Sequence, residues 1–431
     1  MISFNIKQKT GWLVLLLLLL NHSAMAQTND KLTLEECYQL AKINYPAIQK
    51  LDLVAKTSDL EVQNASKRFL PQLSFSGQAT YQSQAISFAN ALASLPMGAS
   101  LPSVSKDQYK IQGEINQLLY DGGITHSQKE LIKANSALQA QNIEGVLYAI
   151  KHRINGLFFS ILLIEAQLKQ NELNKVSLAT QIQKTEAALA NGIAFRSNVD
   201  ELKAEILNLE MIHTDYQSNR TAYLQMLSLF IGKTLPANIQ LVLNETDLAE
   251  TTLNRPEIKA FELQKSIFDK QEKQLKVDYL PQINAFFQSA YGRPTLNIIE
   301  NKFGPWYITG IRFNWSLGSL YTSKNKKRIL NLNRQVVDAD KEIFLLNTKI
   351  DLTLQEEQIL KYQSLLNQDE KAIALRQSVT RSAEAQLANG VITTHEYIQK
   401  INAEHLARQS LILHQIQLLQ AKYNKKYLSG N

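Results

Sequence analysis

Four short stretches of this chain alternate apolar and polar residues with a period of two. In the first, after Pro71, Leu73, Phe75, Ala79 and Tyr81 alternate with glutamine, serine and threonine. The stretch after Pro281 follows the same rule more loosely. A period of two held over about ten residues is typical of a β-strand with two different faces. We therefore expect strands at about residues 70–83, 108–120, 280–292 and 306–318.

Most of the remaining sequence has the period of a helix. No proline lies between Gly123 and Ala190, and apolar residues from Ile150 to Leu168 follow alternating steps of four and three, the spacing of a coiled-coil seam. Long helices are predicted at about 123–190 and 320–388, with shorter helices that return along them at about 198–230 and 396–428. The expected fold class is mainly α with a β portion.

The second half of the chain repeats the first. Pro46, which opens a helix, has a counterpart 210 positions later in Pro256, and Leu119 has one 198 positions later in Leu317. Repetition on this scale indicates a duplicated unit of helix, strand, strand, long helix and returning helix. We expect the first repeat at residues 27–250, ending in a connecting segment at 232–250, and the second at 251–431.

Each long helix is expected to end in a tight turn. Asn191-Gly192 and Asn389-Gly390 supply residues that tolerate a left-handed backbone, which stops a helix. Just beyond them, Ser197-x-x-Asp200 and Thr393-x-x-Glu396 have the spacing of capping boxes that open the next helix.

The expected strands have the length and pattern of transmembrane β-strands. One face is apolar with aromatic residues near its ends, and the other carries mostly uncharged polar residues, as in a barrel around a water-filled lumen. The alternative is a pair of half-buried hairpins packed on helices. Four strands cannot close a barrel, so several chains would have to share one. Residues expected to face lipid are Phe75, Tyr81, Ile111, Ile115, Phe287, Phe313 and Trp315.

The N-terminus resembles a secretory signal peptide. Lys7 and Lys9 precede an apolar run, and Ala24-Met25-Ala26 fits the cleavage site, so residues 1–26 are expected to be removed after Ala26. The residue after the cut is a glutamine, and Cys37 is the only cysteine, so neither a lipid anchor nor a disulfide is expected. The formal charge of +7 is mild for 431 residues and does not indicate nucleic-acid binding.

No pattern of catalytic chemistry is present in the sequence. The histidines show no pairing at metal-ligand spacing, and neither a glycine-rich phosphate loop nor Gly-x-Ser-x-Gly occurs. We therefore expect no enzyme activity, no catalytic residues, no cofactor and no metal site.

The order and spacing of these pieces resemble the TolC-type outer-membrane efflux factors. The residues that carry the resemblance are the repeated Asn-x-Pro and Leu-Pro-Gln, Leu118-Leu119-Tyr120-Asp121-Gly122-Gly123, the repeated Leu-Ala-Asn-Gly, and Leu229-Phe230-Ile231-Gly232-Lys233. The resemblance implies a homotrimer in the outer membrane of a Gram-negative bacterium, with a twelve-stranded barrel and an α-helical tunnel extending into the periplasm. It also implies a periplasmic adaptor (membrane fusion protein) and an inner-membrane pump of the resistance-nodulation-division or ABC type.

Two parts of the sequence leave alternatives open. Trp315-Ser316-Leu317-Gly318-Ser319 replaces the family's usual ending of the fourth strand. Asp200, Glu201 and Glu396 match positions where the family often narrows the periplasmic tip with acids, so they either gate the channel or only cap helices. For the whole protein, the alternatives are a periplasmic coiled-coil structural or adaptor protein with a small soluble β-domain, or the exit duct of a type I protein secretion system.

Overall fold

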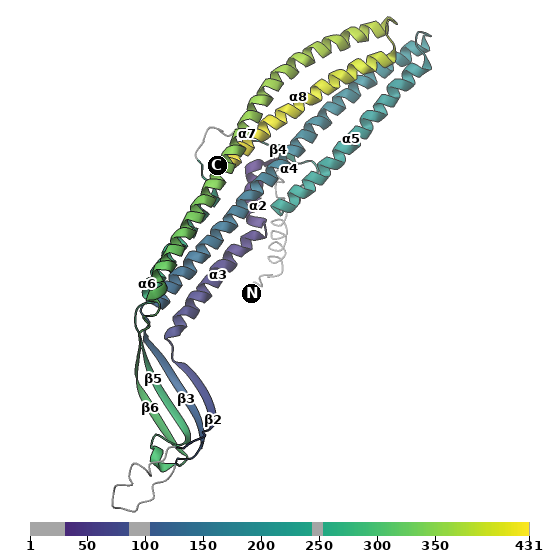
Figure 1. Ribbon diagram of the computed structural model, residues 1–431. Helices are drawn as coiled ribbons and strands as arrows, with labels where there is room; N and C mark the ends of the chain where they lie inside the picture. The colour runs from purple at the N-terminus through teal and green to yellow at the C-terminus, as the bar shows by residue number, and fades with distance from the viewer. Residues whose placement is uncertain (1–30, 86–103, 244–252, 431) are drawn as a thin grey trace, which may run out of the picture. The chain divides into compact units, whose positions relative to one another are not determined.

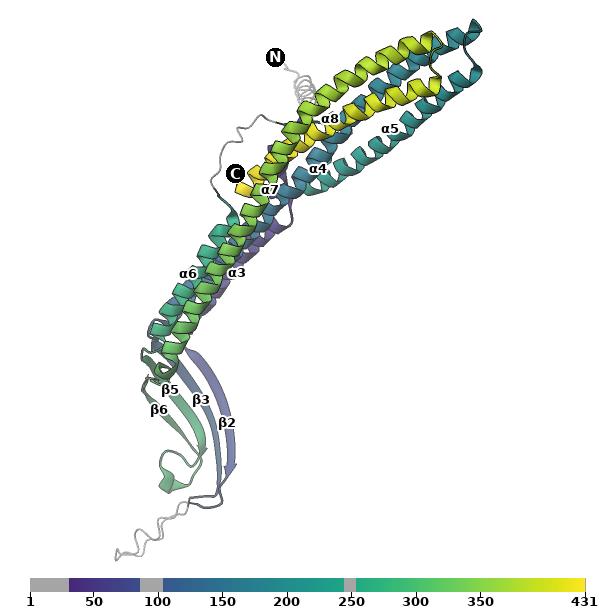
Figure 2. The same ribbon diagram turned by 45° about the horizontal axis from the view of Figure 1, so that its top comes forward.

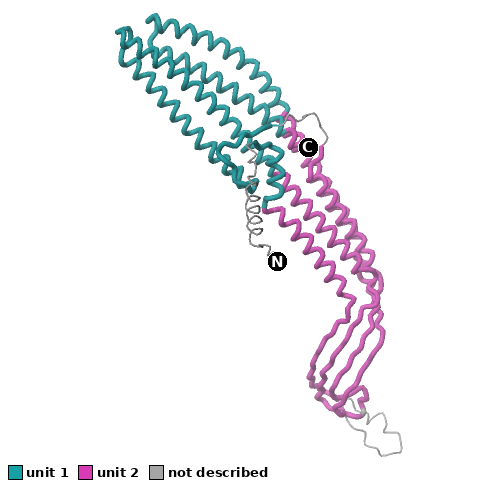
Figure 3. Tube along the Cα trace, turned by 180° about the vertical axis from the view of Figure 1, so that it is seen from behind, with its two compact units in different colours: residues 1–45, 150–250, 356–424 teal, residues 46–149, 251–355, 425–431 magenta. Residues whose placement is uncertain are grey.

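The computed structural model describes residues 31–243 and 253–430, apart from residues 86–103. The expected signal peptide at residues 1–26 lies outside this part of the chain. The chain divides into two compact units, the first made of Met1–Tyr45, Ile150–Glu250 and Glu356–Asn424, and the second of Pro46–Ala149, Thr251–Gln355 and Lys425–Asn431 (Figure 3). Each unit therefore takes segments from both sequence repeats.

The second unit holds a four-stranded antiparallel sheet. Its strands are β2 (Gln72–Tyr81), β3 (Asp107–Tyr120), β5 (Gln282–Arg293) and β6 (Gly304–Asn314), in the order β2-β3-β5-β6 (Figure 1). Strands β2 and β3 form one hairpin and β5 and β6 the other, and the pairing of β3 with β5 joins the two repeats. Pro71 and Pro281 each stand just before a strand, where a missing N–H interrupts no ladder.

The fourth strand is shorter than expected. The sequence pattern predicted it at 306–318, but β6 ends at Asn314 and helix α7 (Leu320–Ala388) begins six residues later. The chain turns in between, because the N–H of Leu320 donates to the carbonyl of Leu317 at 3.1 Å and that of Tyr321 to Gly318 at 3.2 Å. The prediction placed the strand end too late because Trp315 and Leu317 continue the apolar–polar alternation beyond the last residue of the strand.

Helical segments precede and follow these strands along the chain. Helix α3 (Ala47–Ser66) and a 3-10 turn, η2 (Lys67–Phe69), lead into β2, and helix α6 (Pro256–Val277) leads into β5. Helix α4 (Ile124–Ala190) follows β3, as α7 follows β6. A short 3-10 turn, η3 (Ile298–Glu300), lies between β5 and β6.

The Asp-Gly-Gly motif after β3 makes the turn into α4. Asp121 accepts hydrogen bonds from the backbone N–H groups of Gly123 at 2.8 Å and Thr125 at 2.7 Å, which caps the helix. Gly122 has φ of +70°, and a Cβ on it would lie 2.7 Å from the Cβ of Leu280. Only glycine meets both demands at this position.

A partly buried arginine, Arg255, holds the last turn of the chain in the second unit. The Arg255 guanidinium lies 5.1–5.4 Å from the ring centroids of Tyr148, Phe344 and Tyr427 and is paired with Glu257. The N–H of Asn254 also donates to the carbonyl of Ser429 at 2.7 Å. Stacked aromatic faces stabilise a desolvated guanidinium, so the end of helix α8 (Thr394–Ser429) is fixed beside the start of α6.

The first unit is helical and includes a small sheet that the sequence did not predict. It contains α2 (Leu34–Asn44), α5 (Arg196–Ile231) and parts of α4, α7 and α8. Strands β1 (Lys31–Thr33) and β4 (Gln240–Val242) pair in parallel within it. Three-residue strands are too short to show a period of two. The core side chains that are fully buried include Cys37, Ile154, Phe158, Ile161, Leu202 and Leu227.

One described helix, α4, is apolar enough over 18 residues to cross a membrane by length and composition. However, 44% of that stretch is buried inside the protein, and core helices of soluble proteins pass the same test. The burial of Ile154, Phe158 and Ile161 identifies this part of α4 as a core helix.

Candidate functional site

One face of the sheet is apolar and uncovered by other described parts of its unit. The strand pairings place Leu73 opposite Ile115, Ile115 opposite Phe287, and Ile283 opposite Phe313, so these side chains share one face. Phe75 and Tyr81 are each 77% exposed and Ile111 is 70% exposed. Six of the seven residues expected to face lipid lie on this face: Phe75, Tyr81, Ile111, Ile115, Phe287 and Phe313.

The seventh residue, Trp315, lies beyond the end of β6. Its indole N–H donates to the carbonyl of Tyr279 at 2.9 Å, and its ring meets Phe313 edge to face at 6.4 Å. The indole therefore joins the end of β6 to the segment that leads into β5. A tryptophan with an apolar body and a satisfied N–H suits a membrane–water boundary.

The opposite face of the sheet is polar and can hold a charge. Glu114 accepts hydrogen bonds from the side-chain amides of Asn116 at 2.7 Å, Gln288 at 2.8 Å and Gln112 at 3.3 Å. Arg312 stands 3.8 Å from the same carboxylate. A carboxylate so well hydrogen-bonded needs a polar environment, which distinguishes this face from the one that carries Phe75.

Both outer edges of the sheet lack a partner among the described residues. Strand β2 pairs only with β3 and strand β6 only with β5, so one backbone edge of each is open. Open edges invite pairing with another chain. The helices adjoining these edge strands in sequence are α3, before β2, and α7, after β6.

Helix α7 carries an uncovered row of aliphatic residues. Steps of three, four and seven separate these side chains, which matches the seam of a coiled coil. Each is 52–59% exposed, although large aliphatic residues are ordinarily buried. We call this row the α7 seam; it consists of Ile329, Leu332, Val336, Ile343, Leu346 and Ile350.

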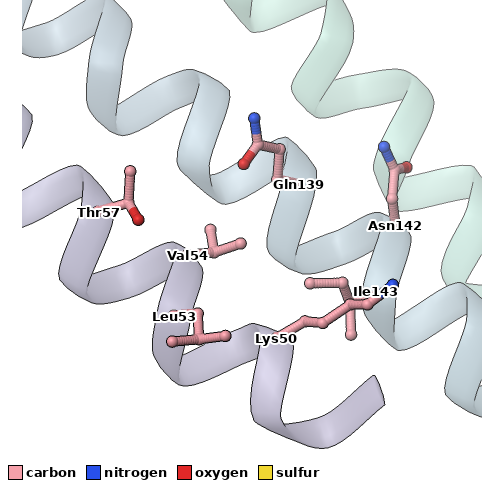
Figure 4. Close-up of a pocket in the computed structure, with 7 residues that line it drawn as sticks. All are labelled: Lys50, Leu53, Val54, Thr57, Gln139, Asn142 and Ile143. Atoms are coloured by element: carbon pink, nitrogen blue, oxygen red, sulfur yellow. The ribbon is translucent and has the colours of Figure 1, made fainter. Parts of the chain in front are cut away.

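A shallow apolar groove lies between α3 and α4. Figure 4 shows Val54 of α3 and Ile143 of α4 directed into the space between the two helices. Leu53, on the same stretch of α3, is 59% exposed. Lys50, Thr57, Gln139 and Asn142 complete the lining. We call this surface the α3–α4 groove.

The two helix turns of the first unit have the same backbone geometry. The N–H of Asn191 donates to the carbonyl of Ala187 at 3.2 Å, and that of Asn389 donates to Ala385 at 3.2 Å. Gly192 has φ of +74° and Gly390 φ of +68°. The two asparagines have negative φ, so in each pair the glycine is the left-handed residue. Each asparagine side chain instead donates a hydrogen bond to a carbonyl of its own long helix, at 2.8–2.9 Å.

The two returning helices begin differently, which corrects one expectation. Thr393 and Glu396 form the expected capping box at the start of α8, with hydrogen bonds of 2.8 and 3.2 Å. Ser197 does not cap α5, because that helix already begins at Arg196. Instead, Asn198 accepts from the N–H of Phe195 at 2.9 Å, and Asp200 lies 3.5 Å from Arg196 on the same helix. Asp200 is therefore free of a capping role.

This difference gives a matched test. Replacing the capping threonine in Thr393→Ala should lower the free energy of unfolding by ~1 kcal/mol, because a helix N–H loses its acceptor. Ser197→Ala should leave stability within the range of a surface change, since Ser197 stands inside α5. Denaturant unfolding followed by circular dichroism measures both; equal losses would contradict the assignment of the caps.

The acids of the turn region make different contacts. Glu201 of α5 lies 3.3 Å from His395 of α8 and so spans the two returning helices, as do Glu205 and Asn402 at 3.1 Å. The hydrogen bonds from the backbone and side chain of Thr393 lower the pKa of Glu396. The contribution of Glu396 to the cap is therefore complete at neutral pH and is lost as the pH falls through that lowered value.

Within the described residues, no group of three or more histidine, cysteine, aspartate or glutamate side chains could hold a metal ion. The candidate functional surfaces are therefore the sheet with its apolar face, polar face and open edges, the α7 seam, the α3–α4 groove and the two helix turns.

Two of the features described above were not predicted from the sequence. The α7 seam was missed, although its three-four spacing is present in the sequence. The contact between Glu201 and His395 was missed because no local pattern signals it.

Comparison with protein-family models gives one match. Residues 37–233 match the family described as outer membrane efflux protein. No curated protein matches this chain in sequence.

Several solved structures have a similar fold. The outer membrane protein VceC from Vibrio cholerae is 13% identical over 92% of this chain and 96% of that chain, with a TM-score of 0.64. CusC is 13% identical over 92% of both chains, with a TM-score of 0.67. The MtrE outer membrane channel of Neisseria gonorrhoeae, in its open state, is 13% identical over 92% of this chain and 89% of that one, with a TM-score of 0.62. The expected fold class of long helices plus four antiparallel strands is confirmed.

Proposed function

We propose that this chain, whose residues 37–233 match the outer membrane efflux protein family, is the passive exit duct of a tripartite efflux system. Proteins of this family transport and do not catalyse. The observation that carries the proposal is the two-faced sheet, in which Phe75 and Ile111 are 77% and 70% exposed on one face while Glu114 is fully hydrogen-bonded on the other. Lipid satisfies the first face and a water-filled lumen the second.

The open edges require several copies of the chain. A sheet in lipid must leave no edge unpaired, and eight strands is the usual minimum for a closed barrel. We propose that β6 of one copy pairs with β2 of the next and that the ring closes with three copies and twelve strands, the number that the family implies. An interface between two different surfaces of the same chain generates a closed ring when the rotations from each copy to the next add up to a full turn.

The same junction extends into the helices. Because α7 follows β6 and α3 precedes β2, the side that carries the α7 seam meets the side that carries the α3–α4 groove of the next copy. Aliphatic knobs such as Ile343 and Leu346 then enter a groove lined by Leu53, Val54 and Ile143. This arrangement covers apolar surface that water would otherwise contact.

We propose that the mature protein begins near Gln27, carries no lipid anchor and lies in the outer membrane of a Gram-negative bacterium. In this proposal it extends into the periplasm and works with a periplasmic adaptor and an inner-membrane pump of the resistance-nodulation-division or ABC type. Copurification after cross-linking identifies the pump class. A polypeptide exporter behind the channel would make it the duct of a type I secretion system.

The proposal is tested on detergent-extracted membranes. The expected result is a trimer of mature chains in the outer-membrane fraction, identified by native mass and by N-terminal sequencing. A soluble monomer or dimer would favour a periplasmic coiled-coil protein with a small β-domain. The exposure of Phe75 and Ile111 argues against that alternative, because a soluble domain would have to cover them.

We further propose that Asp200, Glu201 and Glu396 line the closed entrance of the duct near the Asn-Gly turns. Three copies would bring nine carboxylates to one opening, which favours cations and resists anions. Replacing all three by alanine should raise ion conductance through the protein in a planar bilayer and weaken its preference for cations. The measurement is single-channel conductance with the reversal potential in a salt gradient.

The repeat supplies a matched control for this test. Glu172 and Glu370 are exposed acids at equivalent positions, each 18 residues before the end of its long helix. Glu172→Ala combined with Glu370→Ala removes similar charge away from the turns and should leave conductance unchanged. Unaltered conductance in the triple variant would leave Glu396 as a helix cap only.

A further inference from the structure

Exposed cations gather where the helices of the second unit meet its sheet. Three segments contribute them: η2, the last turn of α6 and the first turns of α7. All eight side chains are exposed. Helix rise places them within about 14 Å of the helix ends that adjoin the strands. We call this set the basic collar; it consists of Lys67, Arg68, Lys273, Lys276, Lys324, Lys326, Lys327 and Arg328.

Few acids balance the collar. The acids close to these segments are Glu272 of α6, which pairs with Lys327 at 3.0 Å, and Asp278, which follows α6. Asp121, at the start of α4, lies near Arg68, and the rest of that helix start is balanced, with Lys129 and Lys133 beside Glu130. The collar therefore keeps a clear excess of positive charge.

The other end of the sheet shows no such excess. The described strand ends and connecting residues there carry three cations, Lys106, Arg293 and Lys302, and two acids, Asp107 and Glu300. Arg293 and Asp107 pair with each other. The positive charge is thus confined to the helical end of the sheet.

A shallow groove lies within the collar, between α6 and α7. It has the apolar residues Leu275 and Leu330 and is rimmed by Lys326 and Asp278; its lining also includes Ile329, the first residue of the α7 seam. An apolar floor beside an ammonium group fits an amphiphile with an anionic head.

We propose that the basic collar binds anionic phospholipid head groups of the leaflet on the helical side of the membrane. This rests on the proposed function, which puts the sheet in the bilayer. Lysine and arginine side chains near a bilayer surface extend their charged ends into the head-group layer, and each contributes about a fivefold gain in attraction to anionic lipid. Phosphatidylglycerol has the required chemistry of one negative phosphate on two acyl chains.

The test measures lipid bound to the purified protein. The wild type in neutral detergent is titrated with phosphatidylglycerol or with phosphatidylcholine of the same acyl chains, and bound lipid is counted by native mass spectrometry. We expect preferential binding of phosphatidylglycerol, weakened by salt. The variant Lys324→Gln/Lys326→Gln/Arg328→Gln should bind it at least about tenfold more weakly.

A matched variant of the same helix controls for total charge. Lys371→Gln/Arg376→Gln/Arg381→Gln neutralises three exposed cations of α7 in the first unit and should bind phosphatidylglycerol as the wild type does. Equal binding of both lipids, or full binding by the collar variant, would overturn the proposal. So would a collar variant that binds lipid normally but changes ion selectivity in a planar bilayer, because its cations would then face the lumen. Failure of the proposed function would instead appear as absence of the wild type from the outer-membrane fraction.

Discussion

Phe75→Arg is expected to prevent most of the protein from assembling in the outer membrane. Phe75 lies in the middle of β2 on the apolar face and is 77% exposed. A cation on the lipid side near the midplane of a barrel costs ~2–4 kcal/mol. In a threefold assembly that cost arises once in each copy. The amount of trimer in the outer-membrane fraction, measured by native electrophoresis, reports the loss.

The control is the same cation three residues along the same strand. Gln78 lies on the polar face, opposite Lys110, so Gln78→Arg should assemble nearly as well as the wild type. The pair Phe313→Asp and Asn314→Asp repeats the comparison with the opposite charge at the end of β6. Equal sensitivity of the two faces would exclude a barrel wall.

Charges on the α7 seam are expected to abolish the trimer while each chain keeps its own helices. Ile343 and Ile350 are both 57% exposed and belong to no core cluster of the single chain. Ile343→Asp combined with Ile350→Asp would bury six carboxylates in the three junctions without partners. Each such group costs several kcal/mol. Analytical ultracentrifugation in detergent is expected to show monomers, and circular dichroism an unchanged helix content.

Asn333→Asp combined with Asn347→Asp adds the same charge at the flank of the seam. Both asparagines are exposed, and flanking positions of a coiled coil tolerate charge. This variant should remain trimeric. If it dissociates as readily as the seam variant, the loss reflects net charge and the seam is not the contact surface.

Local patterns in the sequence predicted most of the fold. The alternation around Phe75 and Ile111 is local and uninterrupted, so it predicts the strands and their two faces independently of how the strands pair. The repeated Asn-Gly pairs located both turns, because a left-handed glycine is a local requirement. Such features depend on neighbouring residues only.

What the sequence did not predict depends on contacts between distant segments. The pairing of β1 with β4 joins residues about 209 positions apart, as Lys31 opposite Gln240 shows, and strands of three residues carry no pattern. Just beyond the end of β6, Trp315 donates a hydrogen bond to the carbonyl of Tyr279, 36 residues earlier in the chain. Ser197 matched a capping motif, but Asn198 supplied the acceptor one position later. Competing polar residues at a helix start cannot be ranked from spacing alone.

In the proposed ring, each junction joins two different sides of the chain, the side with β6 and the α7 seam and the side with β2 and the α3–α4 groove. This difference has a genetic consequence. A copy damaged in the α7 seam still presents an intact α3–α4 groove and an open β2 edge to its neighbour. Such a copy can join a growing ring and then stop it from closing. If damaged and intact chains were made in equal amounts and mixed at random, roughly one ring in eight would contain three intact copies. Seam variants should therefore interfere with the wild-type protein in the same cell, whereas a chain that fails to fold would merely be absent.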